Sequence, residues 1–128
     1  MTPHDLAKAF VTKAREDEVL VTKVVDDPEI SDDLFGFHVQ QAVEKYVKAV
    51  LAVQQSRPKQ THDLAALLEE VRDQGIDVPD EVLAAAAWTP YAVRNRYPFL
   101  GAAPSIDRRA AIELVRAVRE WAEAEVGD

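Results

Sequence analysis

The chain has 128 residues, of which 48% are hydrophobic and 30% charged, and this composition fits one globular domain over residues 1–128 with its own hydrophobic core. A formal net charge of −8 argues against broad, non-specific binding to nucleic acid, because an acidic surface repels phosphate groups. The sequence contains no cysteine, which excludes disulfides, thiolate nucleophiles and cysteine-ligated zinc, and agrees with a reducing cytoplasm. Because only four glycines are present, we expect helices rather than strands.

The start of the chain and its apolar runs carry no membrane signal. The first ten residues, MTPHDLAKAF, lack the apolar segment of a secretory signal peptide. The longest apolar run, residues 82–88, is far too short to cross a bilayer. We therefore expect a soluble cytoplasmic protein that makes no membrane contact.

The first predicted helix opens at TPHD, where Thr2 can cap the helix and Pro3 suits its first turn. Apolar residues then recur at helical spacing up to position 24, and Pro28 is expected to end the segment. Asp17 falls within this apolar stripe. Since a carboxylate in such a position needs a cation beside it, we expect Asp17 to form an ion pair.

The second predicted helix starts after Ser31, runs to about Ser56 and has two distinct faces. Its apolar face, which we expect to be the most buried surface of the protein, comprises Phe35, Val39, Ala42, Val43, Tyr46, Val50 and Val53. A polar stripe comprises Leu34, His38, Gln41, Lys45 and Lys48. Glu44 and Lys48 are predicted to form an i,i+4 ion pair on the surface.

The remaining predicted helices are shorter. A third covers residues 64–71 and is stopped by Gly75, and a fourth begins near Pro79 and is kinked or ended by Pro90. The stretch YAVRNRYPFLGAAPS, residues 91–105, is expected to be a helix end followed by a loop. The last helix takes Ser105 as its cap. The pattern therefore predicts an all-α fold, an antiparallel up-and-down bundle of about five helices.

The charges are unevenly distributed along the chain. The stretch DDPEISDD, residues 26–33, carries five carboxylates and no cation. Residues 91–109 carry Arg94, Arg96, Arg108 and Arg109 against Asp107 alone. These arginines are the one concentrated group of cations that could bind phosphate.

Three stretches together resemble the HEPN domain, a small all-helical module of bacteria and archaea. They are FHVQQAVEKYVKAVLA at 37–52, THDLAALLEEV at 61–71 and RYP at 96–98. The resemblance implies a helical bundle that often forms a homodimer. It also implies a frequent partner, a minimal nucleotidyltransferase with which many such domains form toxin–antitoxin pairs. In the catalytic branches of the family, an Arg-x4-6-His motif late in the chain cuts RNA, with two copies meeting across the dimer.

The ribonuclease motif of those branches is incomplete in this sequence. The late segment at 91–105 holds Arg94 and Arg96 but no histidine. Arg57 and His62, in RPKQTHDL, have the required spacing but lie earlier in the chain. We therefore expect a degenerate motif and a protein that is not a ribonuclease, which acts as a nucleotide- or RNA-binding partner of a nucleotidyltransferase.

Two other functions fit the same residues. The chain could be an active, metal-independent ribonuclease toxin that uses Arg57 with His62, or His62 with Arg96 brought close by folding. It could also be a plain protein-interaction module without a nucleotide site. No glycine-rich phosphate loop or metal-ligand spacing is present in the sequence, so we expect neither a cofactor nor a bound metal.

The candidate site residues could have structural roles instead of binding roles. Nucleotide or phosphate binding is assigned to Arg96, Arg94, His62 and Lys45, and a polar pocket to Asp17, Gln41 and Tyr97. In the structural alternative Arg96 ties its loop to the bundle, with Asp17 as its natural partner. The region of His62 would then be only a helix start, capped by Thr61 or Asp63.

Overall fold

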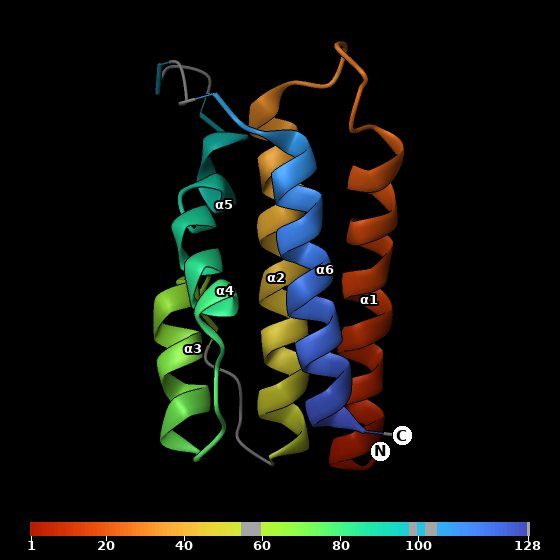
Figure 1. Ribbon diagram of the computed structural model, residues 1–128, viewed down its shortest axis with the longest axis vertical. Helices are drawn as coiled ribbons and strands as arrows, with labels where there is room; N and C mark the ends of the chain where they lie inside the picture. The colour runs from red at the N-terminus through yellow and green to blue at the C-terminus, as the bar shows by residue number, and fades with distance from the viewer. Residues whose placement is uncertain (55–59, 98–99, 102–104, 128) are drawn as a thin grey trace.

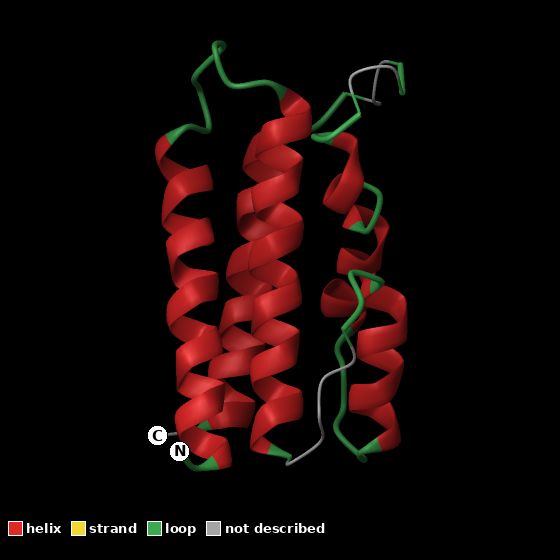
Figure 2. Cartoon of the chain, turned by 180° about the vertical axis from the view of Figure 1, so that it is seen from behind, coloured by secondary structure: helices red, strands yellow, loops and turns green. Residues whose placement is uncertain are grey.

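The computed structural model describes residues 1–54, 60–97, 100–101 and 105–127, and every regular element in that part of the chain is a helix (Figures 1 and 2). In chain order the elements are α1 (Pro3–Lys23), α2 (Asp32–Val53), α3 (Leu64–Asp73), α4 (Asp80–Leu83), the 3-10 helix η1 (Ala84–Trp88), α5 (Tyr91–Arg94) and α6 (Arg108–Val126). The predicted all-α helical bundle is therefore confirmed.

Helix α1 begins with the predicted cap. The Thr2 hydroxyl accepts a hydrogen bond from the Asp5 amide at 3.0 Å, and the Asp5 carboxylate accepts one from the Thr2 amide at 3.0 Å. The predicted end at Pro28 is too late, because α1 stops at Lys23 and turns follow it. Carbonyl groups of those turns accept hydrogen bonds from Arg108 of α6 instead of continuing the helix.

Helix α2 is the central element, and it contacts α1, α3, α5 and α6. Its predicted apolar face is confirmed as the core: the side chains that are at most 1% exposed include Phe35, Val39, Ala42, Val43, Tyr46 and Val50. Burial extends beyond that face, because neighbours surround the helix. Gln40, Val47 and Leu51 are fully buried as well.

The segment from α4 to α5 is broken up by its prolines. Pro79 precedes α4, which gives way to η1, and Pro90 separates η1 from α5. Proline cannot donate the hydrogen bond that a continuing helix needs, so the chain forms a series of short turns here. Figure 1 shows this series rising beside α2, from the level of α3 to the end of the bundle that also holds the α1–α2 connection.

Helix α6 closes the bundle against α1 and α2. Its cap is Asp107, whose carboxylate accepts a hydrogen bond from the Ala110 amide at 3.0 Å, so the prediction of Ser105 as the cap is wrong by two residues. Asp107 is the better cap because the carboxylate also favours the positive end of the helix dipole. Near the other end, Trp121 Nε1 donates to the Asp77 carbonyl at 3.0 Å and ties α6 to the α3–α4 connection.

Gly36 allows α5 to approach α2 closely. A Cβ at this buried position would overlap the Tyr91 ring, whose Cγ and Cε1 atoms would lie 2.7 Å away. We expect Gly36→Ala to destabilise the fold by about 1–3 kcal/mol through overpacking, although alanine's helix propensity offsets part of this cost. Urea unfolding measures the effect. In the double variant Gly36→Ala/Tyr91→Leu, much of the lost stability should be recovered. If the effects of the two substitutions on the free energy of unfolding simply added, this packing would be contradicted.

Candidate functional site

The first polar cluster on α2 surrounds the Asp17 carboxylate of α1, and we call Asp17, His38 and Lys45 the Asp17 cluster. His38 Nδ1 lies 2.8 Å from Asp17 Oδ1, and Lys45 Nζ donates to Oδ2 at 2.6 Å. Positions 38 and 45 are two helical turns apart, so both side chains leave the same side of α2. The expected cation beside Asp17 is present, and it is Lys45.

The expected ion pair between Arg96 and Asp17 is not found, although the structure describes both residues. Both Asp17 oxygens are bound by α2 side chains, and Arg96 is exposed in the turn that follows α5. The physical reason is proximity: α2 packs along α1, which places Lys45 of α2 beside the Asp17 carboxylate.

The second cluster surrounds the carboxylate of Glu44, and we call Gln40, Glu44, Lys48 and His62 the Glu44 cluster. His62 Nδ1 lies 2.7 Å from Glu44 Oε1, and Gln40 Nε2 donates to the same oxygen at 2.8 Å. Lys48 Nζ donates to Oε2 at 3.0 Å. The predicted Glu44–Lys48 pair is confirmed, but its place on the surface is wrong, because Glu44 is only 4% exposed.

The Glu44 cluster also positions the turn that leads into α3. Gln40 Nε2 donates to the backbone carbonyl of His62 at 3.3 Å. Asp63 caps α3 by accepting from the Ala66 amide, and Thr61 accepts from the Asp63 amide at 3.1 Å, so the predicted capping at this junction is confirmed. The His62 ring is half-exposed at 52% while its Nδ1 edge is held on α2.

Glu44 is held in its ionised form. Burial opposes ionisation, but hydrogen bonds from His62, Gln40 and Lys48 outweigh it and lower the pKa of Glu44 below its ordinary value of 4.5. An ionised carboxylate only accepts hydrogen bonds, so the proton between the two groups is on His62 Nδ1. In the neutral tautomer this leaves Nε2 as an acceptor, which suits the ring to bind a donor or to carry a proton.

Because the pKa of Glu44 is lower in the folded chain than in the unfolded one, its contribution to stability is present above 4.5 and is lost as the pH falls through the folded value. We expect Glu44→Gln to cost about 1–3 kcal/mol near neutral pH. The difference between wild type and variant should shrink as the pH falls from about 6 to about 3. Urea unfolding across this range checks it, and a difference that stays constant would contradict the ionised state.

Two residues of the predicted polar pocket, Asp17 and Gln41, make contacts in different clusters. Gln41 Nε2 donates to Gln40 Oε1 at 2.8 Å and so belongs beside the Glu44 cluster, whereas Asp17 lies in its own cluster. Tyr97 follows α5, and its side chain is 44% exposed. Asp17 and Gln41 therefore have different partners, and a pocket that also includes Tyr97 stays a prediction.

The acidic stretch at 26–33 and the late arginines bind one another. Arg94 Nε donates to Asp33 Oδ1 at 3.0 Å, and its terminal nitrogen donates to the Gly101 carbonyl at 2.6 Å. Arg109 forms an exposed pair with Asp26 at 2.5 Å. Two of the cations that the sequence offers for phosphate binding, Arg94 and Arg109, are thus paired with carboxylates within the fold.

Arg108 is the most firmly held of these arginines. Its Nε donates to Asp32 at 3.0 Å, and its terminal nitrogens donate to carbonyl groups of the α1–α2 connection, those of Val24, Asp27 and Ile30. The guanidinium also lies 4.9 Å from the centre of the Phe35 ring. Since Arg108 binds carbonyl groups of the turns that follow α1, its role is structural.

The sequence interpretation missed a third buried contact. Tyr46 donates its hydroxyl hydrogen to Glu18 Oε1 at 2.6 Å, and Arg119 Nε lies 3.4 Å from the same oxygen. Burial, with the carboxylate beside it, raises the pKa of Tyr46 far above its usual range. The signal was present, because Glu18 occupies the i+4 position from Ala14, between the buried positions 14 and 21 of the α1 stripe.

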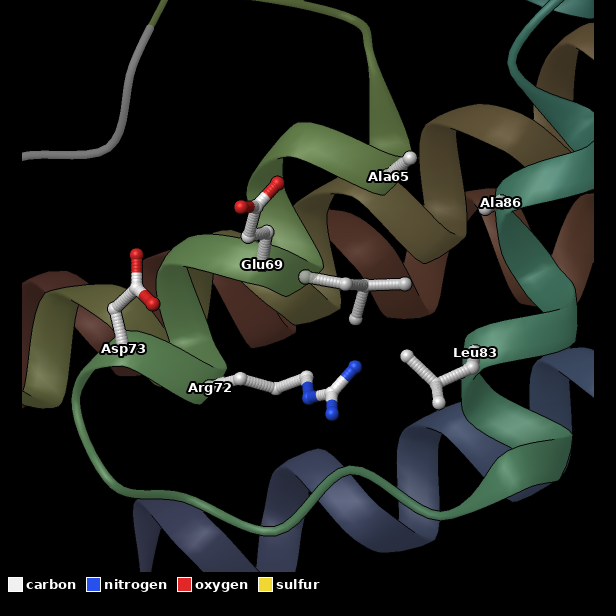
Figure 3. A pocket seen from close by; sticks show the side chains of 7 residues that line it. Ala65, Glu69, Arg72, Asp73, Leu83 and Ala86 are labelled. Atoms are coloured by element: carbon white, nitrogen blue, oxygen red, sulfur yellow. The ribbon is translucent and has the colours of Figure 1, made fainter.

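A hollow of about 670 Å³ lies between α3 and the α4–η1 segment. In Figure 3 the Arg72 side chain extends across it towards Leu83, while the carboxylates of Glu69 and Asp73 point away. Arg72 covers the apolar lining with its aliphatic stem, as long cationic side chains commonly do.

Other kinds of site receive no support from the part of the chain that the structure describes. Among those residues, no three histidine or carboxylate side chains are grouped so that they could hold a metal ion. In the same part, no helix is both long and apolar enough to cross a membrane. Arg57 of the early Arg-x4-His spacing lies outside the described residues.

Comparison with known protein families identifies a match. The family model described as HEPN domain matches residues 31–125, which span α2 to α6 and include both the Glu44 cluster and the late arginines. The chain matches no curated protein and no solved structure.

Proposed function

We propose, because this chain belongs to the HEPN domain family, that it is a member that does not cut RNA and that acts by binding a partner protein. The observation that carries the proposal is the pairing of Arg94, Arg108 and Arg109 with carboxylates of residues 26–33. The charges of these arginines are balanced within the fold, which leaves little unpaired positive charge for an RNA backbone.

Metal-independent RNA cleavage needs a base that removes the 2′-OH proton and a cation that stabilises the charge on the phosphorus centre. The chain's late segment contains no histidine. His62, just before α3, has a suitable imidazole, but its Nδ1 is bound to Glu44 of α2. Arg94 belongs to α5 and binds Asp33. This distribution supports a degenerate ribonuclease motif.

The proposed partner is a minimal nucleotidyltransferase, in a toxin–antitoxin-type pair of the kind the family frequently forms. We expect a gene for such an enzyme beside the gene for this chain. When the two are co-expressed and the transferase carries a tag, this chain should co-purify with it in a fixed ratio. A transferase that elutes alone under conditions in which both proteins are folded would contradict the pairing.

A nucleotide or RNA is the second candidate ligand, and Arg96 favours it. This side chain is exposed, and no residue in the described ranges forms an ion pair with it. The half-exposed ring of His62 and the partly buried amine of Lys45 lie elsewhere in the fold, and each is bound to a carboxylate. We therefore expect weak RNA binding that decreases as the salt concentration rises and that Arg96→Ala removes, measured by fluorescence anisotropy.

We also propose that the chain forms a homodimer through the exposed apolar side chains that follow η1. Val93, Tyr97 and Leu100 are 42%, 44% and 46% exposed within a few residues of one another. Light scattering should give twice the 14.2 kDa mass of one chain, and Leu100→Asp should shift the protein to the single-chain mass. The exposed Leu6→Asp on α1 is the matched control, and a monomeric wild type would contradict the dimer.

A further inference from the structure

Two adjoining hollows form a continuous groove along α6. The first, of about 670 Å³, lies between α6 and the η1–α5 segment, and the second, of about 370 Å³, lies between α6 and α4. Ala110 and Leu114 line both hollows and connect them. Arg94 borders the groove, but no residue of the polar clusters of α2 lines it.

The end of the groove beside α5 is apolar. Trp88, Tyr91 and Ile106 line it together with Leu114, and all four side chains are only partly buried. The Trp88 and Tyr91 rings lie 5.1 Å apart and form one aromatic wall. Arg94 borders this end, but its guanidinium is bound to Asp33 and Gly101. A ligand at this end would therefore make mainly apolar contacts.

The end beside α4 is acidic. Glu81, Glu113 and Glu120 line it, and all three are exposed. One cation, Arg116, lies among them and is 3.3 Å from Glu113, so negative charge remains in excess. The groove therefore changes from aromatic and apolar to acidic along its length.

We propose that this groove binds an amphipathic helix of a partner protein, with an apolar face on the Trp88–Leu114 end and lysine or arginine side chains on the Glu113–Glu120 end. The inference rests on the proposal that the chain works by binding a partner protein. Between Asp107 and Glu120 the α6 axis advances about 20 Å, the length of a helix of about 13 residues. A helix in a groove uses apolar anchors for affinity and complementary charge for orientation.

The test uses synthetic peptides and the full chain. The first peptide is an amphipathic helix of about 14 residues with leucines on one face and lysines on the other, the second replaces the lysines with glutamates, and the third scrambles the first. Binding is measured by anisotropy of the labelled peptide and by the fluorescence of the chain. We expect the basic amphipathic peptide to bind at least about tenfold more tightly than the other two.

Matched variants locate the binding. Ala110→Glu, at the junction of the two hollows, should weaken binding about tenfold, whereas Ala65→Glu, at another exposed alanine in the hollow of Figure 3, should leave it unchanged. Glu120→Lys should weaken it and Glu69→Lys should not. Circular dichroism confirms that each variant is folded.

Equal binding of the basic and scrambled peptides would overturn the inference, and so would equal weakening of binding by Ala65→Glu and Ala110→Glu. Loss of homodimers on Ala110→Glu would also overturn it, because it would assign the groove to a second copy of this chain. Because the assay contains neither RNA nor a nucleotidyltransferase, its failure is separate from a failure of the proposed function. A chain that cuts RNA or lacks that partner would leave the peptide result intact.

Discussion

Replacing Tyr46 with alanine is expected to lower the free energy of unfolding by about 3–5 kcal/mol, the largest single effect in this protein. The ring is fully buried at the centre of the α2 core face, so its removal leaves a cavity that surrounding helices fill only in part. The substitution also removes the hydroxyl that donates to Glu18, a carboxylate that is 7% exposed. Urea unfolding followed by circular dichroism measures the change.

Tyr46→Phe separates the two contributions. It keeps the ring and removes only the hydrogen bond, so it should cost about 1–2 kcal/mol, with Arg119 still near the Glu18 carboxylate. If Tyr46→Ala lowered the free energy of unfolding by less than about 1 kcal/mol, this would contradict the packing of the ring in the core and the position described for α2.

Replacing Arg108 with alanine is expected to cost about 2–3 kcal/mol, because hydrogen bonds from a charged donor to several acceptors are lost together. The guanidinium joins Asp32 to carbonyl groups of the α1–α2 connection and packs on Phe35. We also expect faster amide hydrogen exchange in residues 24–31 of the variant, since these turns lose the donor that holds them.

Arg109 provides the matched comparison, since it is the next residue and also pairs with a carboxylate. Its pair with Asp26 is exposed, with both side chains at 73%, and such pairs contribute little to stability. Arg109→Ala should therefore leave unfolding and exchange nearly unchanged. Equal effects of the two substitutions would show that Arg108 is merely another surface charge.

The sequence predicted the fold well because helical periodicity records which side of a helix is buried. The apolar spacing from Phe35 to Val50 identified the core face of α2, and Thr2 and Asp63 were recognisable as caps. Pro90 was recognisable as a break. These features depend on neighbours within about one or two turns, which a single sequence contains.

Partners across helices were harder to predict, because periodicity gives the face of a residue but not the residue opposite. Asp17 was recognised as a carboxylate that needs a cation, yet its partner is Lys45 and not Arg96. Glu44 was assigned to the surface because i,i+4 pairs are commonly exposed, but it is buried and is bound by His62, which precedes α3. The late arginines were visible in the sequence. The pairing of Arg94, Arg108 and Arg109 with residues 26–33 depends on how the helices pack in the bundle.

The most direct test of the proposed function is the cleavage of labelled single-stranded RNA by the purified chain without added metal. We expect the RNA to stay intact with the wild type and with His62→Ala and Arg57→Ala, because Arg94, Arg108 and Arg109 are paired with carboxylates and His62 is bound to Glu44. Robust cleavage by the wild type that both substitutions abolish would contradict this account and would identify RPKQTHDL as an active site.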